Sequence, residues 1–574
     1  MIDLKAYPNR ITMDVIADEH IRLFKKHAIL LCGAGISVKS GIPSVIPFTQ
    51  HLFRKLKASE ADLQTFLDSG FPFEAMMEVL KTRLDIFELL SVFDKINVNA
   101  NHQLIACMAK RGWLRMIITT NFDRNIEAAL REVGLSEQQD FVVLHDLRLM
   151  KKFLLKKKIL VLKIHGSIED HPSILSTITG VANLANRQRM TQFLDRLFSS
   201  GQFDEVITWG YSFSDHFDIK PAIREMSPTT KRIYSVRYQS GILPEKILDN
   251  SNDELFRNFL AATNWFCSLD KIVKSAARSM GIRLKSVKKL PWKKMMSGTL
   301  SKEITGHGLK NANGILAALF QTAGHTDIAK KYAEKELAKC TTRSKDRLLR
   351  MDLLASVGKA YLRDPNNRDP NTALKYLEEA RDVASRLQLS DYTRIYNADI
   401  GSCYLMLERY AEVEAPYLEA IIYYKGLMSD PYSRGMAVDR VTGYQTMLAH
   451  SFAKLKNYRN ALALYKKTLK LCEKEGLLAN QELCLAGYGL AYGLSNQPEK
   501  ALPLFIEGYR LAVLNGSADR IKSQFYLTCS WMWSAKGEAE ALKFYTKEYD
   551  FVHEKTGMDK SLKAIGPGLT GSLK

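Results

Sequence analysis

Residues 27–37 are HAILLCGAGIS, in which the apolar run from Ala28 to Cys32 leads directly into a glycine-rich turn. Four later segments also contain an apolar run, and in most of them a polar, turn-forming cluster follows it. These segments are RMIITTNFD (115–123), ILVLKIHGS (159–167), EVITWGYSFSD (205–215) and KRIYSVRY (231–238). Helical stretches separate them. Continuous apolar strands that alternate with helices predict a parallel sheet covered on both faces, a doubly wound α/β domain. Ligands of such domains bind at the carboxyl ends of the strands, where the polar clusters lie.

Beyond residue 311 the pattern changes to helices that repeat along the chain. A small apolar residue recurs at intervals of 44, 40, 48, 40 and 40 residues: Ala329, Ala373, Val413, Ala461, Ala501 and Ala541. Another small residue lies 12 positions before most of them, and an aromatic residue recurs four positions after them at Tyr417, Tyr465, Phe505 and Tyr545. Small residues that face large ones let neighbouring helices stack into a solenoid. This region resembles tetratricopeptide repeats with long linkers.

The sequence therefore predicts three parts: an α/β domain over 1–285, a basic linker over 286–310 and a helical repeat domain over 311–574. A chain of 574 residues is too long for one hydrophobic core, and its 46% hydrophobic and 25% charged residues are typical of folded proteins. The eight cysteines form no Cys-x-x-Cys pair, so we expect neither a zinc ribbon nor a disulfide framework. Because no signal peptide or membrane-length apolar run is evident, we expect a cytoplasmic protein.

The formal net charge is +20, and part of the excess is local. Between Lys271 and Lys294 there are nine Lys or Arg residues and no acid, and a second cluster lies at 151–158. Exposed helix faces near a domain junction explain this charge better than a nucleic-acid site, because no nucleic-acid motif accompanies it. Contact with an acidic protein or a nucleic acid stays open.

The turn after the first apolar run contains Gly33-Ala34-Gly35-Ile36-Ser37, and Ser40-Gly41-Ile42-Pro43 follows it. Glycines here would let backbone N–H groups approach a pyrophosphate, and the start of a helix favours negative charge. Taken alone, the two glycines fit a plain tight turn better than a nucleotide site. The polar ends of the later strands strengthen the interpretation as a nucleotide site.

In order and spacing, over about residues 21–236, these motifs resemble the sirtuin family. GAGIS and SGIP are similar to the family's cofactor-binding loop, TTNFD (119–123) to its Asn–Asp strand end, HGS (165–167) to its catalytic His-Gly, and GYSFSD (210–215) to its later nucleotide-binding loop. The resemblance implies that Asn121 and Asp123 flank the nicotinamide ribose of NAD and that His165 is the base. The implied cofactor contacts are Gly33, Ala34, Gly35, Ser37, Pro43, Gly210, Ser212 and Asp215.

Each candidate catalytic residue also has a structural interpretation. Asn121 is placed to be a strand-end turn residue, and Asp123 to cap the helix that begins NIEAAL at 125. His165 follows an apolar strand, where histidines are often hydrogen-bonded in a core. We expect His102, in the helical stretch NHQLIACMAKRGW, to be structural or helix-capping.

Two departures from the family pattern bear on activity. Residues 166–209 contain no cysteine, whereas deacylases of the family carry a four-cysteine zinc module there, and SVIPF follows GIP in place of the acidic-Phe-Arg sequence. Both departures resemble the sirtuin-like NAD hydrolases of bacterial anti-phage systems, in which such a domain is fused to a sensing module. The resemblance implies an NAD glycohydrolase that takes NAD as its substrate and needs no metal. It also implies an abortive-infection effector.

The chemistry of the residues fits this activity but leaves alternatives open. His165 can accept a proton near neutral pH, and water as the nucleophile would give nicotinamide and ADP-ribose. An acetyl-lysine oxygen as the nucleophile would make the protein a deacylase, and a third hypothesis is a non-enzymatic nucleotide-sensing adaptor. We expect as partners a protein or peptide trigger on the repeat domain, such as a phage protein, and further copies of the chain in a homo-oligomer. No membrane partner is expected.

Overall fold

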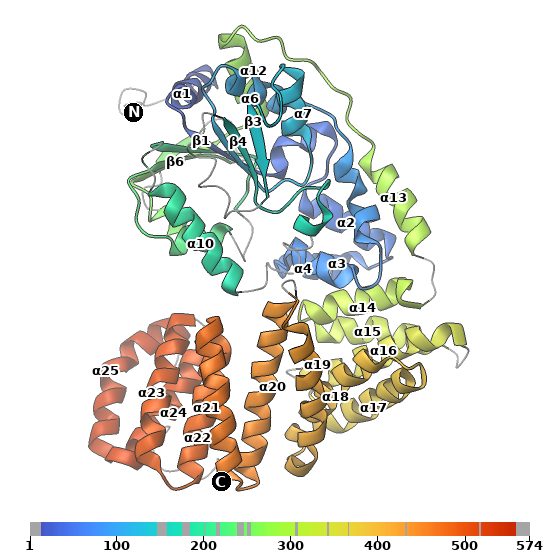
Figure 1. Ribbon diagram of the computed structural model, residues 1–574, viewed down its shortest axis with the longest axis vertical. Coiled ribbons are helices and arrows are strands. Elements are labelled where there is room, and N and C mark those ends of the chain that lie inside the picture. The colour runs from blue at the N-terminus through green and yellow to red at the C-terminus, as the bar shows by residue number, and fades with distance from the viewer. Residues whose placement is uncertain are drawn as a thin grey trace. The chain divides into compact units, whose positions relative to one another are not determined.

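The computed structural model describes residues 13–145, 158–174, 184–199, 201, 203–213, 219–237, 246–249, 254–304, 308–340, 344–364, 367–430, 433–515 and 518–557 (Figure 1). The chain divides into two compact units, Met1–Ile328 and Ala329–Lys574. Asp215 and most of the lysine cluster at 151–158 lie outside the described residues. The domain boundaries predicted at 285 and 310 remain predictions, and the segment between them contains helix α13 (Trp292–Glu303).

The first unit is built on an eight-stranded sheet with the order β3-β4-β2-β1-β5-β6-β8-β7. All pairings are parallel except that of β7 with β8. The strands are β1 (Ile29–Cys32), β2 (Met116–Thr119), β3 (Phe141–Leu144), β4 (Ile159–Lys163), β5 (Glu205–Trp209), β6 (Arg232–Arg237), β7 (Lys246–Asp249) and β8 (Ala261–Phe266). The chain first extends the sheet on one side of β1 and then, from β5 onward, on the other. The switch point, where ligands of such folds bind, therefore lies between β1 and β5.

Helices cover both faces of the sheet, which confirms the predicted doubly wound fold. Leu30 and Ile117 belong to a buried core on one face, and the next residues, Leu31 and Ile118, belong to a core on the other. The first core contains residues of α1 (Met13–Lys25), α6 (Ala100–Lys110), α7 (Asn125–Glu132) and α12 (Leu269–Ser279). The second contains residues of α10 (Leu184–Phe198) and α11 (Ile219–Glu225).

A group of helices lies between β1 and β2 in the sequence. They are α2 (Val45–Lys55), α3 (Glu60–Asp68), α4 (Phe73–Leu80) and α5 (Ile86–Leu90), followed by α6. The rings of Phe53 and Phe66 meet Phe320 of α14 (Ala312–Thr322) edge-on, at 5.8 and 5.7 Å between centroids. This aromatic cluster ties α2 and α3 to a residue more than 250 positions further along the chain.

The second unit is a tetratricopeptide-like repeat of helices. After α15 (Thr326–Leu337), which begins in the first unit, each helix packs on the next. These helices are α16 (Ser344–Arg363), α17 (Pro370–Arg386), α18 (Ser390–Met406), α19 (Glu414–Leu427), α20 (Arg434–Lys454), α21 (Tyr458–Glu475), α22 (Leu478–Leu494), α23 (Pro498–Asn515), α24 (Ala518–Lys536) and α25 (Glu538–Thr556). Across the described part of the chain, no helix is both long enough and apolar enough to cross a membrane.

The small–large pairs predicted from the sequence form the repeat core. A Cβ added to Gly401 would lie 3.0 Å from the ring of Tyr417, and one added to Gly489 would lie 2.9 Å from the ring of Phe505. Both aromatic side chains are buried. Glycine at these positions therefore lets each helix approach the aromatic face of its neighbour, as the solenoid requires.

Candidate functional site

The glycine turns that follow β1 and β5 pack directly on each other at the switch point. The amide of Gly33 donates to the carbonyl oxygen of Trp209 at 3.1 Å, and that of Gly35 to Gly210 at 2.9 Å. Gly210 has φ +62°, and a Cβ there would lie 2.5 Å from the amide nitrogen of Ile36. The glycines are thus required for this close approach. The amides of Gly33 and Gly35 already have partners within the protein, and the phosphate contacts expected of this turn, Ala34 included, remain predictions.

The hydroxyl of Ser37 is the centre of a buried hydrogen-bond network. It donates to Asp123 Oδ2 at 2.9 Å, accepts from Asn121 Nδ2 at 3.2 Å and lies 3.1 Å from His102 Nε2. The amide of Asn99 donates to His102 Nδ1 at 3.2 Å, so the His102 proton lies on Nε2 and is donated to Ser37. Burial lowers the pKa of His102 to about 4, which keeps the ring neutral near pH 7.

The expected capping roles are present together with this network. Asn99 and His102 form the capping box of α6, in agreement with the structural role expected of His102. Asp123 Oδ1 accepts from the amide of Asn125, the first residue of α7, at 3.0 Å. Asp123 therefore holds the start of α7 with one oxygen and Ser37 with the other, so the capping and site interpretations are compatible.

Within the described part of the chain, Asn121 presents a buried acceptor that has no partner. Its side-chain nitrogen is bonded to Ser37, which fixes the orientation of the amide, while its Oδ1 has no hydrogen bond among the described residues. A buried oxygen without a partner is unfavourable unless a ligand or water supplies a donor. The arrangement fits a group that brings a hydroxyl, such as the ribose of a nucleotide.

His165 lies at the neighbouring strand end. β2 pairs with β4 in parallel, with Thr119 opposite Lys163, so Asn121 and His165 each follow their strand by two residues at the same edge of the sheet. The His165 side chain is 10% exposed, and its Nδ1 lies 3.6 Å from Oε1 of Glu74, in the first turn of α4. No sequence motif indicates that Glu74 lies here.

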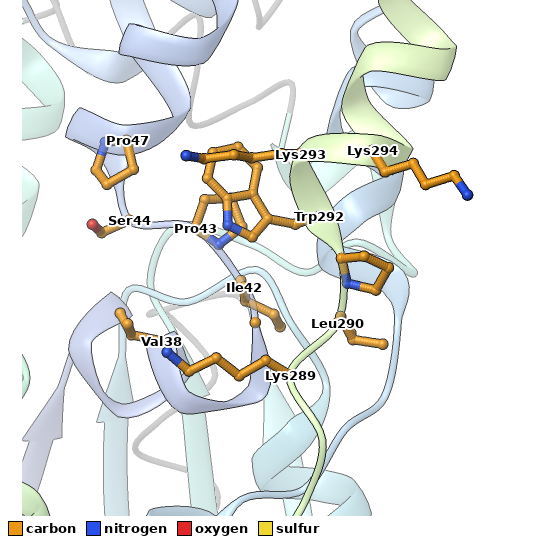
Figure 2. A pocket seen from close by; sticks show the side chains of 12 residues that line it. Val38, Ile42, Pro43, Ser44, Pro47, Lys289, Leu290, Trp292, Lys293 and Lys294 are labelled. Atoms are coloured by element: carbon orange, nitrogen blue, oxygen red, sulfur yellow. The ribbon is translucent and has the colours of Figure 1, made fainter.

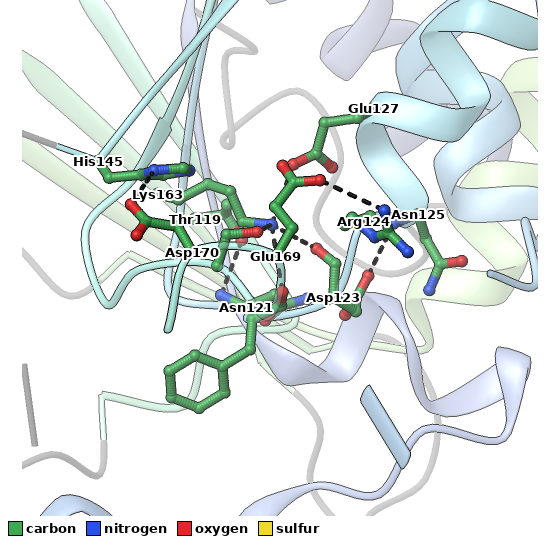
Figure 3. A network of polar contacts seen from close by, with 12 residues as sticks. Thr119, Asn121, Asp123, Arg124, Asn125, Glu127, His145, Lys163, Glu169 and Asp170 are labelled. Atoms are coloured by element: carbon green, nitrogen blue, oxygen red, sulfur yellow. Dashed lines mark hydrogen bonds and ion pairs between the residues drawn. The ribbon is translucent and has the colours of Figure 1, made fainter. Parts of the chain in front are cut away.

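A buried lysine connects the two strand-end turns (Figure 3). Lys163 Nζ donates to the carbonyl oxygens of Phe122 and Asp123 at 3.2 and 2.7 Å. It also contacts Glu127 Oε1 and Ser167 Oγ, both at 2.9 Å. The lysine thus ties the turn that carries Asn121 to the turn that follows His165 and to α7.

A second feature near the glycine turn is a pocket of about 440 Å³, lined by residues of 38–47 and 289–294 (Figure 2). The amide of Leu290 donates to the carbonyl oxygen of Ser40 at 3.0 Å, and a Cβ on Gly41 would clash with the Leu290 backbone. Pro43, a predicted cofactor contact, lines this pocket together with Trp292. Neither Asn121 nor His165 does.

Gly210 and Ser212, two further predicted cofactor contacts, follow β5. Gly210 lies at the switch point, and Ser212 is exposed two residues beyond it. No group of His, Cys, Asp or Glu suited to a metal ion occurs among the residues that the structure describes.

Residues 115–262 match the family described as SIR2-like domain. The match includes Asn121, Asp123, His165 and Gly210, and it begins after the glycine turn at 33–37. The first unit therefore contains a region similar to SIR2-like domains. No curated protein matches the chain.

Similarities to solved structures are weak. The chain is similar to BtubC from P. vanneervenii, with 18% identity, 36% of this chain and 82% of that chain covered and a TM-score of 0.30. It is also similar to aspartyl phosphate phosphatase F from Bacillus subtilis, with 16% identity, 45% of this chain and 71% of that chain covered and a TM-score of 0.33. A third similar structure is a signal transduction ATPase with a tetratricopeptide repeat sensor from Pyrococcus horikoshii, with 15% identity, 46% of this chain and 40% of that chain covered and a TM-score of 0.32.

Proposed function

We propose that the first unit is an NAD glycohydrolase, which cleaves the bond between nicotinamide and ribose with water. The observation that carries the proposal is the buried, unpartnered Oδ1 of Asn121, at the strand end next to that of His165 within a SIR2-like domain. If Asn121 only shaped a turn, its side-chain nitrogen would not need to be held by Ser37 while its Oδ1 stays without a partner among the described residues. The residues present fit NAD as a substrate.

In this reaction the C–N bond breaks, nicotinamide leaves with the bonding electrons, water adds to the ribose carbon and one proton is released. Asn121 accepts a hydrogen bond from a ribose hydroxyl or from the attacking water. Asp123, buried and held by Ser37, places a negative charge where positive charge develops on the ribose. His165 accepts the proton of the water.

Water is preferred over an acyl-lysine oxygen as the nucleophile because residues 166–209 contain no cysteine and hence no four-cysteine zinc module of the deacylase type. The proposal predicts that purified protein converts NAD to nicotinamide and ADP-ribose without any peptide. A protein that consumes NAD only when an acetylated peptide is added is a deacylase.

The test compares Asn121→Ala and His165→Ala with wild type by chromatography of the products. Loss of a general base is expected to slow turnover by about 10²–10⁴-fold. Asn371→Ala, which removes an exposed amide from α17, is the control and should keep wild-type activity. Equal NAD turnover by wild type and His165→Ala would refute the assignment of the base.

We also propose that the helical repeat regulates this activity by binding a protein or peptide trigger, and that the protein is a cytoplasmic, homo-oligomeric effector of anti-phage defence. The support is the resemblance stated above and the joining of a SIR2-like domain to a repeat unit in one chain. Cellular NAD should fall after phage challenge in cells with wild type and stay constant in cells with His165→Ala. Light scattering of the pure protein tests the oligomer.

A further inference from the structure

The carboxylate of Glu74 lies beside Nδ1 of the His165 ring. The separation of Glu74 Oε1 and His165 Nδ1 is 3.6 Å, and the two side chains are 15% and 10% exposed. Glu74 belongs to the helices between β1 and β2, outside residues 115–262. Neither the family match nor the sequence motifs assign it a role.

The first turn of α4 is anchored at the site by packing. Phe73, next to Glu74, is buried, and its ring lies 5.5 Å from Phe48 and 6.3 Å from Phe122, measured between centroids. Phe122 is the residue between Asn121 and Asp123. The positive end of the helix dipole also favours a carboxylate in the first turn. The position of Glu74 is therefore coupled to the same turn that positions Asn121.

We propose that Glu74 is a positioning residue for His165: its charge, 3.6 Å from Nδ1, favours a proton on Nδ1 and so leaves the lone pair of Nε2 for the proton of the attacking water. This inference rests on the proposed function. As the proton moves to Nε2, Glu74 stays ionised and stabilises the imidazolium by charge. Because both side chains are largely shielded from water, the attraction exceeds that of a surface pair.

Other titratable groups lie at this edge of the sheet, and they have partners of their own. Asp123 and His102 meet through Ser37, and Lys163 pairs with Glu127. Arg124 bridges Asp94 and Glu169, and His145 pairs with Asp170 at 3.1 Å. None of these pairs includes Glu74 or His165, so a change in the titration of His165 in a Glu74 variant is expected to report on Glu74.

The test is Glu74→Gln, which keeps size and removes the charge. A nearby carboxylate favours the imidazolium, so its removal should lower the pKa of His165 by about one unit or more, measured by NMR titration without substrate. Since the base acts when deprotonated, the acid limb of the kcat profile should move to lower pH by the same amount. kcat at neutral pH should fall about tenfold, with KM unchanged.

Glu78→Gln is the matched control, because Glu78 lies one turn further along α4 and pairs with Lys81 on the surface at 2.6 Å. It should leave both the pKa of His165 and the pH profile unchanged. Glu74→Asp keeps the charge on a shorter side chain and should give values between wild type and Glu74→Gln. A His165 that titrates in Glu74→Gln as it does in wild type overturns the inference. If wild type lacks NAD hydrolysis, the proposed function fails, while the titration still tests the pair.

Discussion

Removal of the buried ion pair between Lys163 and Glu127 should affect stability and catalysis differently. Both side chains are 1% exposed. In Lys163→Met the carboxylate of Glu127 is left buried without its partner, and loss of one partner of a buried pair costs about 3–5 kcal/mol. The carbonyl oxygens of Phe122 and Asp123 lose a donor as well. A folded domain has about 5–15 kcal/mol of stability in total, so the single variant should be severely destabilised.

The double variant Lys163→Met, Glu127→Met removes both charges. Replacing a buried pair by apolar side chains of similar volume is often neutral or stabilising, so the double variant should regain most of the lost stability. Activity should not return, because the turn that holds Asn121 is no longer tied to the turn after His165. Misplacement of reacting groups by about 1 Å can cost about 10²-fold in rate.

Urea unfolding followed by circular dichroism measures the stability, and NAD hydrolysis at saturating substrate measures kcat. Arg54→Met is the control, since it breaks an exposed pair with Glu60 in the same unit and should leave the stability close to that of wild type. Full activity in a stable double variant would refute the positioning role. If Lys163→Met were as stable as wild type, the prediction that Glu127 is left as a buried, uncompensated charge would be wrong.

Three further predictions concern packing and pH. Gly210→Ala should lower the stability by about 2–3 kcal/mol, because its Cβ would meet the backbone of Ile36. Its control is Gly112→Ala, which also has a positive φ but lies in open space and should cost only about 1–2 kcal/mol. Thermal unfolding of the two variants measures the difference. In the repeat, Gly489→Ala should destabilise through contact with Phe505, while Gly443→Ala, in open space within α20, should stabilise by about 1 kcal/mol; opposite signs in urea unfolding are the check. Burial lowers the pKa of His20 to about 4 from a usual value near 6.5. Its folded form binds fewer protons than its unfolded form, so stability should fall by up to about 3 kcal/mol as pH drops from 6.5 towards 4, and this slope should shrink in His20→Gln.

β1, β2, β4, β5 and β6 all fall within the five quoted segments. β3 is FVVL, an apolar run as short as β1 and β2 that lies outside those segments, and it pairs with β4 along its whole length. β8 is AATNWF, in which alanine and asparagine are poor strand formers. It pairs with β6 along its whole length, a tertiary effect that local sequence does not carry.

For the candidate site, the sequence located the strand-end residues but not the contacts between them. The contact of Ser37 with the cofactor stays a prediction, and its hydroxyl also joins His102 and Asp123, 65 and 86 residues away, which no motif indicated. Glu74 has no motif around it. Lys163 did leave a signal, a single charge inside the apolar run ILVLKIHGS, since a lysine in a buried strand must have partners.

The bond between Leu290 and Ser40 has a practical consequence for anyone who shortens this protein. A fragment trimmed to residues 115–262 would lack the glycine turn, and one that ended near 284 would remove one of the two donors to the Ser40 carbonyl, the amide of Leu290, and the Lys288 carbonyl from the Asn97 side chain. It would also uncover the rings of Phe53 and Phe66 that meet Phe320. The smallest piece in which the glycine turn keeps its native surroundings therefore ends after α14, about sixty residues beyond the family match.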